Sequence, residues 1–128
     1  MPRISLAFFG AAVLFALTGM AMGIWMGTTE DFTYAPVHAH INLLGWVTLA
    51  LMGTFYALAG DAAPRLLAWV NFWVSVAGNL LTLPMLVMFL GGNRSVIPPM
   101  AAGEVAIVVG MLVFGFSVLT VARRPAAA

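Results

Sequence analysis

Hydrophobic residues in this chain form four long runs, at about residues 4–25, 35–59, 66–90 and 98–121. Each run approaches the ~20 residues that a helix needs to cross a bilayer. Short segments rich in Gly, Asn, Asp and Thr separate the runs, and such residues favour turns and helix ends. The pattern predicts an all-α fold, in which residues 1–128 form a single integral membrane bundle of four transmembrane helices.

The composition supports the membrane prediction and excludes several kinds of site. Hydrophobic residues make up 63% of the chain, charged residues 7%, and the mean hydropathy is +1.08, unlike a soluble domain. The absence of cysteine excludes disulfides, thiolate metal sites, iron–sulfur clusters and covalent c-type haem attachment. The net charge of +1 includes no basic cluster, so we expect no nucleic-acid partner.

The arginines favour one orientation in the lipid bilayer. Four helices place Arg3, Arg65, Arg123 and Arg124 on one side and only Arg94 on the other. By the positive-inside rule, both termini are expected in the cytoplasm, with the chain in the inner (cytoplasmic) membrane of the cell. The first run is longer than the apolar core of a secretory signal, so we expect it to be retained as a helix.

This orientation brings the candidate chemistry to the outer side of the membrane. The only two histidines, His38 and His40, lie near the start of the second run, and Glu104 lies near the start of the fourth. Ionisable groups in a membrane-spanning helix are costly, which makes each a functional hypothesis. Glu104 is expected to partner His40 or to serve a proton path, and all three are candidate metal ligands. The structural alternative is an interfacial histidine and a protonated or hydrogen-bonded Glu104.

The spacing of the histidines argues against simple chelation. Residues two apart on a helix point about 200° from one another, so His38 and His40 should face different neighbours, one of which could be another protomer. The positive end of the helix dipole favours neutral imidazoles and attracts anions such as haem propionates, which Arg94 could also bind. Further axial-ligand candidates near this side are Met22, Met26 and Met100.

Polar and small residues inside the runs predict how the helices pack. Interhelical hydrogen bonds are the default expectation for the polar residues inside the runs, which are Asn42, Thr48, Thr54, Asn71, Asn79 and Thr82. Pro84 is expected to kink the third helix and free a carbonyl. Small residues recur four apart on the first helix and predict a face for close packing, at Gly19, Gly23 and Gly27.

Residues 36–46 (PVHAHINLLGW) and 53–56 (GTFY) resemble the second transmembrane helix of haem-copper oxidase catalytic subunits, especially the nitric-oxide-reductase and cbb3-type branches. In that family the helix carries an axial histidine of the low-spin haem, just after a proline. The resemblance implies that His38 binds haem b and that His40 binds a second metal or reaches another protomer. The other ligands of the family lie on later helices, which implies that one copy of this chain is not a complete oxidase.

The resemblance also implies an assembly. The catalytic subunit of the family is similar to three four-helix arcs around a pseudo-threefold axis, and this chain is one arc long. It therefore implies a homo-oligomer, such as a trimer, in which copies of His38 and His40 replace the missing ligands.

Three functions follow as hypotheses. The first is a haem b protein for electron transfer or for sensing a gas or redox state, with a redox partner or an oxidase complex. The second is a copper or zinc binding or assembly protein that uses His38, His40 and Glu104. The third is an accessory subunit of a membrane complex without a cofactor. Whether the chain is an enzyme stays open.

Overall fold

The structure, a computed structural model, describes residues 1–123, so Arg124 lies outside the described residues. The described part is helical and contains no strand. The elements in chain order are α1 (Arg3–Thr29), α2 (Ala35–His40), the π-helix η1 (Ile41–Val47), α3 (Thr48–Ala59), the 3-10 helix η2 (Gly60–Ala62), α4 (Arg65–Leu90), the 3-10 helix η3 (Arg94–Val96) and α5 (Ile97–Ala122). The stretch from α2 to η2 runs without a break and is called the second span below.

Four helical segments are long and apolar enough to cross a membrane: Arg3–Thr29, Ala35–Ala62, Arg65–Leu90 and Arg94–Ala122. The prediction of an all-α fold with four helices of this kind is confirmed. The segments begin and end within a few residues of the predicted runs.

The end of α1 is the largest difference from the predicted bounds. The prediction placed Thr28 and Thr29 in a loop, but the helix includes them. Their hydroxyls donate to the carbonyl oxygen of Trp25, one turn back in the same helix, at 3.0 Å and 2.8 Å. The helix stops at Glu30, whose φ of 56° is left-handed.

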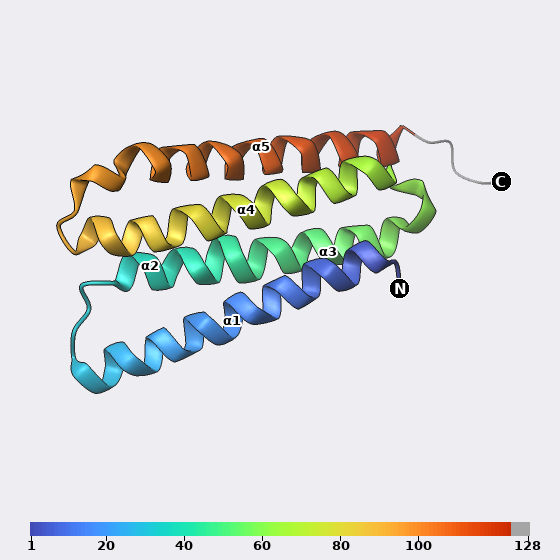
Figure 1. The fold of residues 1–128 in the computed structure, drawn as a ribbon. Helices are drawn as coiled ribbons and strands as arrows, with labels where there is room; N and C mark the ends of the chain where they lie inside the picture. Colours follow the sequence, from blue (N-terminus) through green and yellow to red (C-terminus); the bar gives the residue numbers. More distant parts are fainter. Residues whose placement is uncertain (124–128) are drawn as a thin grey trace.

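The helices lie antiparallel, and each packs on its neighbours in the chain (Figure 1). α1 packs mainly on the second span, and α5 packs mainly on α4. The loop from α1 to α2 and the loop from α4 to η3 lie at the same end of the molecule, opposite the N-terminus (Figure 1). The starts of α2 and α5 are therefore at one end, as the sequence predicted.

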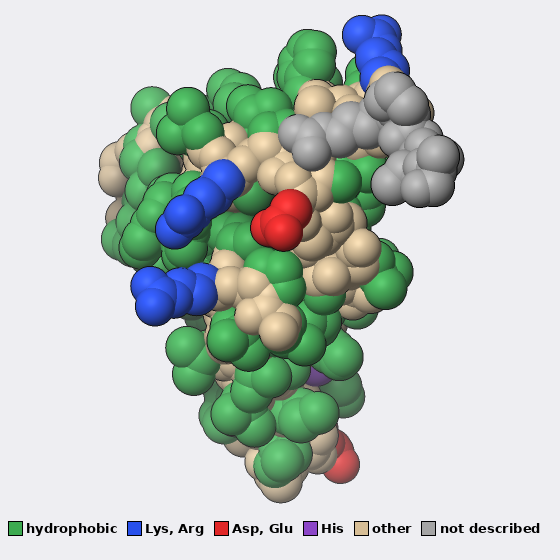
Figure 2. Space-filling view, turned by 90° about the vertical axis from the view of Figure 1, so that its right-hand side faces the viewer, with side chains coloured by type: hydrophobic (Ala, Val, Ile, Leu, Met, Phe, Trp, Pro, Cys, Tyr) green, Lys and Arg blue, Asp and Glu red, His purple; other side chains and the backbone are tan. Residues whose placement is uncertain are grey.

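Charged side chains gather near the two ends of the helices. At the end that carries the N-terminus, Arg3, Asp61 and Arg65 line one cavity of about 270 Å³. Figure 2 looks onto this end and shows basic side chains beside an acidic one, on a surface that is otherwise largely apolar. Arg94 begins η3 at the opposite end.

A buried polar cluster joins three of the segments. The hydroxyl of Tyr56 in α3 accepts a hydrogen bond from Nδ2 of Asn71 in α4 and donates one to Oγ of Ser117 in α5, each at 3.1 Å. Oγ of Ser75 donates to Oδ1 of Asn71 at 3.1 Å. The ring of Tyr56 also stacks on Phe8 of α1, with the ring centroids 5.4 Å apart. The interhelical hydrogen bond predicted for Asn71 is confirmed.

Tyr56→Phe is expected to lower the free energy of unfolding by about 1–2 kcal/mol, because it removes two buried hydrogen bonds that join α3 to Asn71 and Ser117. The measurement is unfolding by sodium dodecyl sulfate in mixed micelles, followed by circular dichroism. The matched control is Tyr34→Phe, which removes the same atom from a half-buried tyrosine outside this cluster. Equal losses in the two variants would contradict the prediction.

Candidate functional site

The candidate site begins at an irregular stretch of the second span. Pro36 lies in the first turn of α2, where the missing N–H costs nothing. Directly after the two histidines, the backbone widens into the π-helix Ile41–Val47. The N–H and the hydroxyl of Thr48 both donate to the carbonyl of Leu43, five residues back, the hydroxyl at 2.7 Å. Such single π-turns often occur at functional sites because they redirect the side chains around them.

His38 lies against α1. Its Nδ1 is 2.9 Å from the carbonyl oxygen of Gly19, and since a carbonyl only accepts, Nδ1 carries the proton and donates. Nδ2 of Asn42 is 3.4 Å from Nε2 of the ring and 2.8 Å from the backbone carbonyl of His38. Both ring nitrogens of His38 thus have neighbours within the chain.

The glycines of α1 make room for these side chains. A Cβ at Gly19 would lie 2.8 Å from the amide of Asn42, and a Cβ at Gly23 would lie 3.0 Å from Cε1 of His38. Real Cβ atoms essentially never approach as closely as at Gly19, and the contact at Gly23 is tighter than nine in ten real ones, so the close-packing face predicted on the first helix is confirmed at these two glycines. Gly27 has nothing within 4 Å of its Cβ position and does not belong to the face.

His40 faces the other way, as the two-residue spacing predicts. Its Nδ1 is 2.7 Å from the carbonyl oxygen of Pro36, to which it donates. The ring is exposed and lines a cavity of about 260 Å³ between the second span, α4 and α5. Because Nδ1 holds the proton, the lone pair of Nε2 is available to a metal or a proton.

Glu104 lines the same cavity as His40. Thr82 of α4 also lines it, and its Oγ1 is buried without a hydrogen-bond partner among the described residues. The remaining walls are apolar, formed by Leu44, Leu86, Ile107 and Val108. The structure therefore brings together an imidazole, a carboxyl and a hydroxyl from three different segments, and it keeps His38 away from them.

The other candidate residues lie outside this cavity. Arg94 is exposed in η3, with its guanidinium 6.0 Å from the ring centroid of Phe89. Met22 lines a different cavity, and Met26 is buried. Within residues 1–123, no group of three or more His, Asp or Glu side chains is close enough to hold a metal ion.

The prediction of interhelical hydrogen bonds is wrong for five of the six polar residues. The hydroxyls of Thr48 and Thr54 donate to backbone carbonyls of their own span. Asn42 bonds within its own span, Asn79 donates to the Ser75 carbonyl in its own helix, and Thr82 has no partner in the described part of the chain. Asparagine and threonine side chains are short enough to bond the backbone one turn back, and this local bond competes with a partner on another helix.

The loop before α2 adds negative charge to this end. Hydrogen bonds from the hydroxyl and the N–H of Thr33 lower the pKa of Asp31, with the N–H 3.0 Å from Oδ1. Asp31 is therefore ionised near neutral pH. It precedes the start of the second span, at Ala35, by four residues.

Comparisons of the chain with protein-family models, curated proteins and solved structures find no match. The resemblance of residues 36–46 and 53–56 to haem-copper oxidases stays a prediction.

Proposed function

We propose that this chain is a multi-pass membrane protein that binds haem b through His40, as a homo-oligomer with both termini in the cytoplasm. One observation supports the proposal above others: Nδ1 of His40 donates to a backbone carbonyl at 2.7 Å, which leaves Nε2 as the free ligand. Histidines that bind metals almost always donate their other ring nitrogen in this way.

The ligand count favours haem over a bare ion. Structural zinc sites take four protein ligands and catalytic ones three, whereas no group of three His, Asp or Glu side chains comes together within residues 1–123. Haem iron needs only one or two axial ligands from the protein. A single imidazole per chain is thus enough to bind haem iron.

The size of the cavity favours a binding surface shared between copies. At about 260 Å³, the cavity beside His40 falls below the range of about 300–1,000 Å³ typical of small-molecule pockets, so one chain does not enclose a haem. Apart from Glu104, exposed residues beside it on α5 are apolar, among them Val105, Val108 and Leu112. We infer that a haem lies against this face and that a second copy covers it.

His40 is a better ligand than His38 on geometric grounds, although the family resemblance favours His38. Nε2 of His38 already faces the amide of Asn42, and its ring packs against Gly23. In this proposal His38 fixes the start of the second span to α1. Haem supplies a redox-active iron; two imidazoles from two copies suit electron transfer, and one suits gas sensing.

The test is the visible absorption spectrum, haem-to-protein ratio and oligomer mass of protein purified from cells supplied with haem. We expect a Soret band, a reproducible ratio and a particle larger than one chain. A protein that stays colourless after reconstitution with haem overturns the proposal.

Copper or zinc binding is the second candidate, because His40 and Glu104 share one small cavity. A second copy would complete the ligand set of such an ion. Elemental analysis separates the two functions: Glu104→Gln should lower the content of a bare metal strongly and leave haem content unchanged. A colourless, metal-free protein would point to an accessory subunit.

A further inference from the structure

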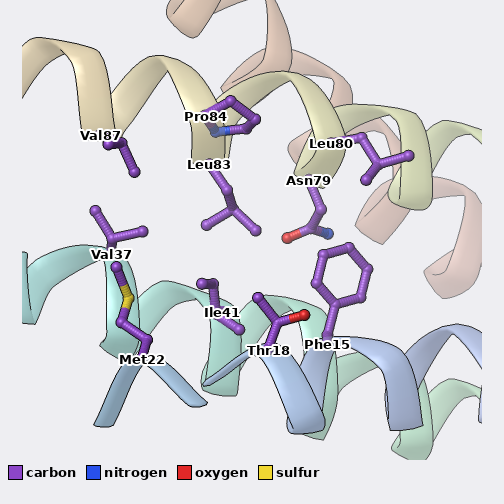
Figure 3. Close-up of a pocket in the computed structure, with 10 residues that line it drawn as sticks. All are labelled: Phe15, Thr18, Met22, Val37, Ile41, Asn79, Leu80, Leu83, Pro84 and Val87. Carbon is purple, nitrogen blue, oxygen red and sulfur yellow. The ribbon is translucent and has the colours of Figure 1, made fainter. Parts of the chain in front are cut away.

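A second cavity lies between α1, the second span and α4, whereas the cavity of His40 lies between the second span, α4 and α5. Its volume is about 330 Å³. Figure 3 shows side chains from all three segments converging on it. The walls are almost wholly apolar and include Phe15, Met22, Ile41 and Leu83.

Thr18 and Asn79 are the two polar residues that line this cavity, and the hydroxyl of Thr18 donates to the carbonyl oxygen of Leu14 at 2.8 Å. The side chain of Asn79 is 1% exposed, and its Nδ2 donates to the carbonyl oxygen of Ser75 at 2.9 Å. Since a carbonyl only accepts, this bond fixes which end of the amide points where. Oδ1 is then left buried with no donor among the described residues. In Figure 3 this oxygen lies on the side of the cavity where Leu83 and Ile41 are drawn.

We propose that this cavity binds a lipid-soluble phenol, whose hydroxyl donates a hydrogen bond to Oδ1 of Asn79. A buried acceptor without a partner costs free energy, and a ligand with one donor recovers it. The cavity has no charged side chain in its lining, which excludes an ionic ligand.

The walls and the volume favour a single aromatic ring. Phe15 offers an aromatic neighbour and Met22 a thioether, and both groups pack well against rings. About 330 Å³ lies near the lower limit of small-molecule pockets, which leaves room for one ring with short substituents. The proposal does not depend on haem binding.

The test compares 4-butylphenol with 4-butylanisole, the methyl ether that has no donor. In the intact protein in detergent micelles, saturation binding should show the phenol about tenfold tighter than the ether, as expected for one buried hydrogen bond. Asn79→Leu, which keeps the size of the side chain, should abolish this preference. Comparing the ratio of the two affinities between the proteins cancels the different partitioning of the probes into micelles.

Two bulky substitutions locate the binding. Leu83→Trp fills the cavity and should abolish binding of both probes. The matched control is Val13→Trp, which fills a cavity of about 340 Å³ lined by Val13, Ala16 and Trp46 and should leave binding unchanged. Equal affinities for phenol and ether in the unmodified protein, or a preference that persists in Asn79→Leu, would overturn the proposal. A colourless protein, which would contradict haem binding, would leave the proposed phenol site untouched.

Discussion

His40→Ala is expected to lose the Soret band, whereas His38→Ala is expected to keep it. The loss of an outer-shell partner already lowers metal affinity by about 10–100-fold, and the loss of the ligand itself should cost at least as much. His38→Ala removes the hydrogen bond to Gly19 and leaves the exposed ring of His40 unchanged. The measurement is the haem-to-protein ratio of both variants, purified in parallel under equal haem supply.

Added imidazole is the control for this pair of variants. If His40 supplies the ligand, free imidazole should restore the Soret band of His40→Ala, and circular dichroism should show unchanged helicity. The reverse result, a colourless His38→Ala and a red His40→Ala, would favour the ligand that the family resemblance implies. Haem retained at full content by both variants would exclude both assignments.

The positions of the four long helices could be predicted from the sequence, because the length of each apolar run indicates a helix that can cross a membrane. The third run was expected at 66–90, and α4 spans Arg65–Leu90. The end of α1 could not be predicted as well, because Thr28 and Thr29 are typical of loops as much as of helix ends. In the structure both residues belong to the helix, and their hydroxyls donate to the carbonyl of Trp25 one turn back.

That His40 and Glu104 lie at a similar depth, where both line one cavity, could also be predicted. Prolines mark the starts of both helices, at Pro36 and at 98–99, so counting turns from each gives the same depth. That Thr82 lines the same cavity could not be predicted, because which face of α4 turns toward the cavity depends on how the helix is rotated about its axis. That rotation follows from the close approach of Gly103 to Thr82, which is a property of the packed pair of helices.

No residue pattern in the sequence predicts the π-helix Ile41–Val47. Within it, a Cβ at Gly45 would lie 2.5 Å from the ring of Phe15, so the glycine leaves room for that ring of α1. The orientation of the Asn79 amide is set within α4, by its bond to the Ser75 carbonyl one turn back. Hydropathy places a polar residue at a depth, but only packing decides which of its atoms stays unpaired.

Gly78→Leu is expected to separate α4 from α5. A Cβ at Gly78 would lie 2.9 Å from the backbone nitrogen of Ile107 and 3.0 Å from the backbone oxygen of Gly103. Backbone atoms cannot turn aside as a flexible side chain can, so the helices must move apart. Overpacking typically costs about 1–3 kcal/mol, and we expect this variant at or above the upper limit. The measurement is unfolding by sodium dodecyl sulfate, followed by circular dichroism.

Gly115→Leu is the matched control on the same pair of helices, because nothing lies within 4 Å of the Cβ position of Gly115. It is expected to be neutral or slightly stabilising, since leucine favours helix over glycine by up to about 1 kcal/mol. Equal stability of the two variants would mean that the contact at Gly78 does not hold α5 in place. If it does hold α5, Gly78→Leu should also lower haem content, because Ile107, Thr82 and Glu104 line the cavity of His40 from these two helices.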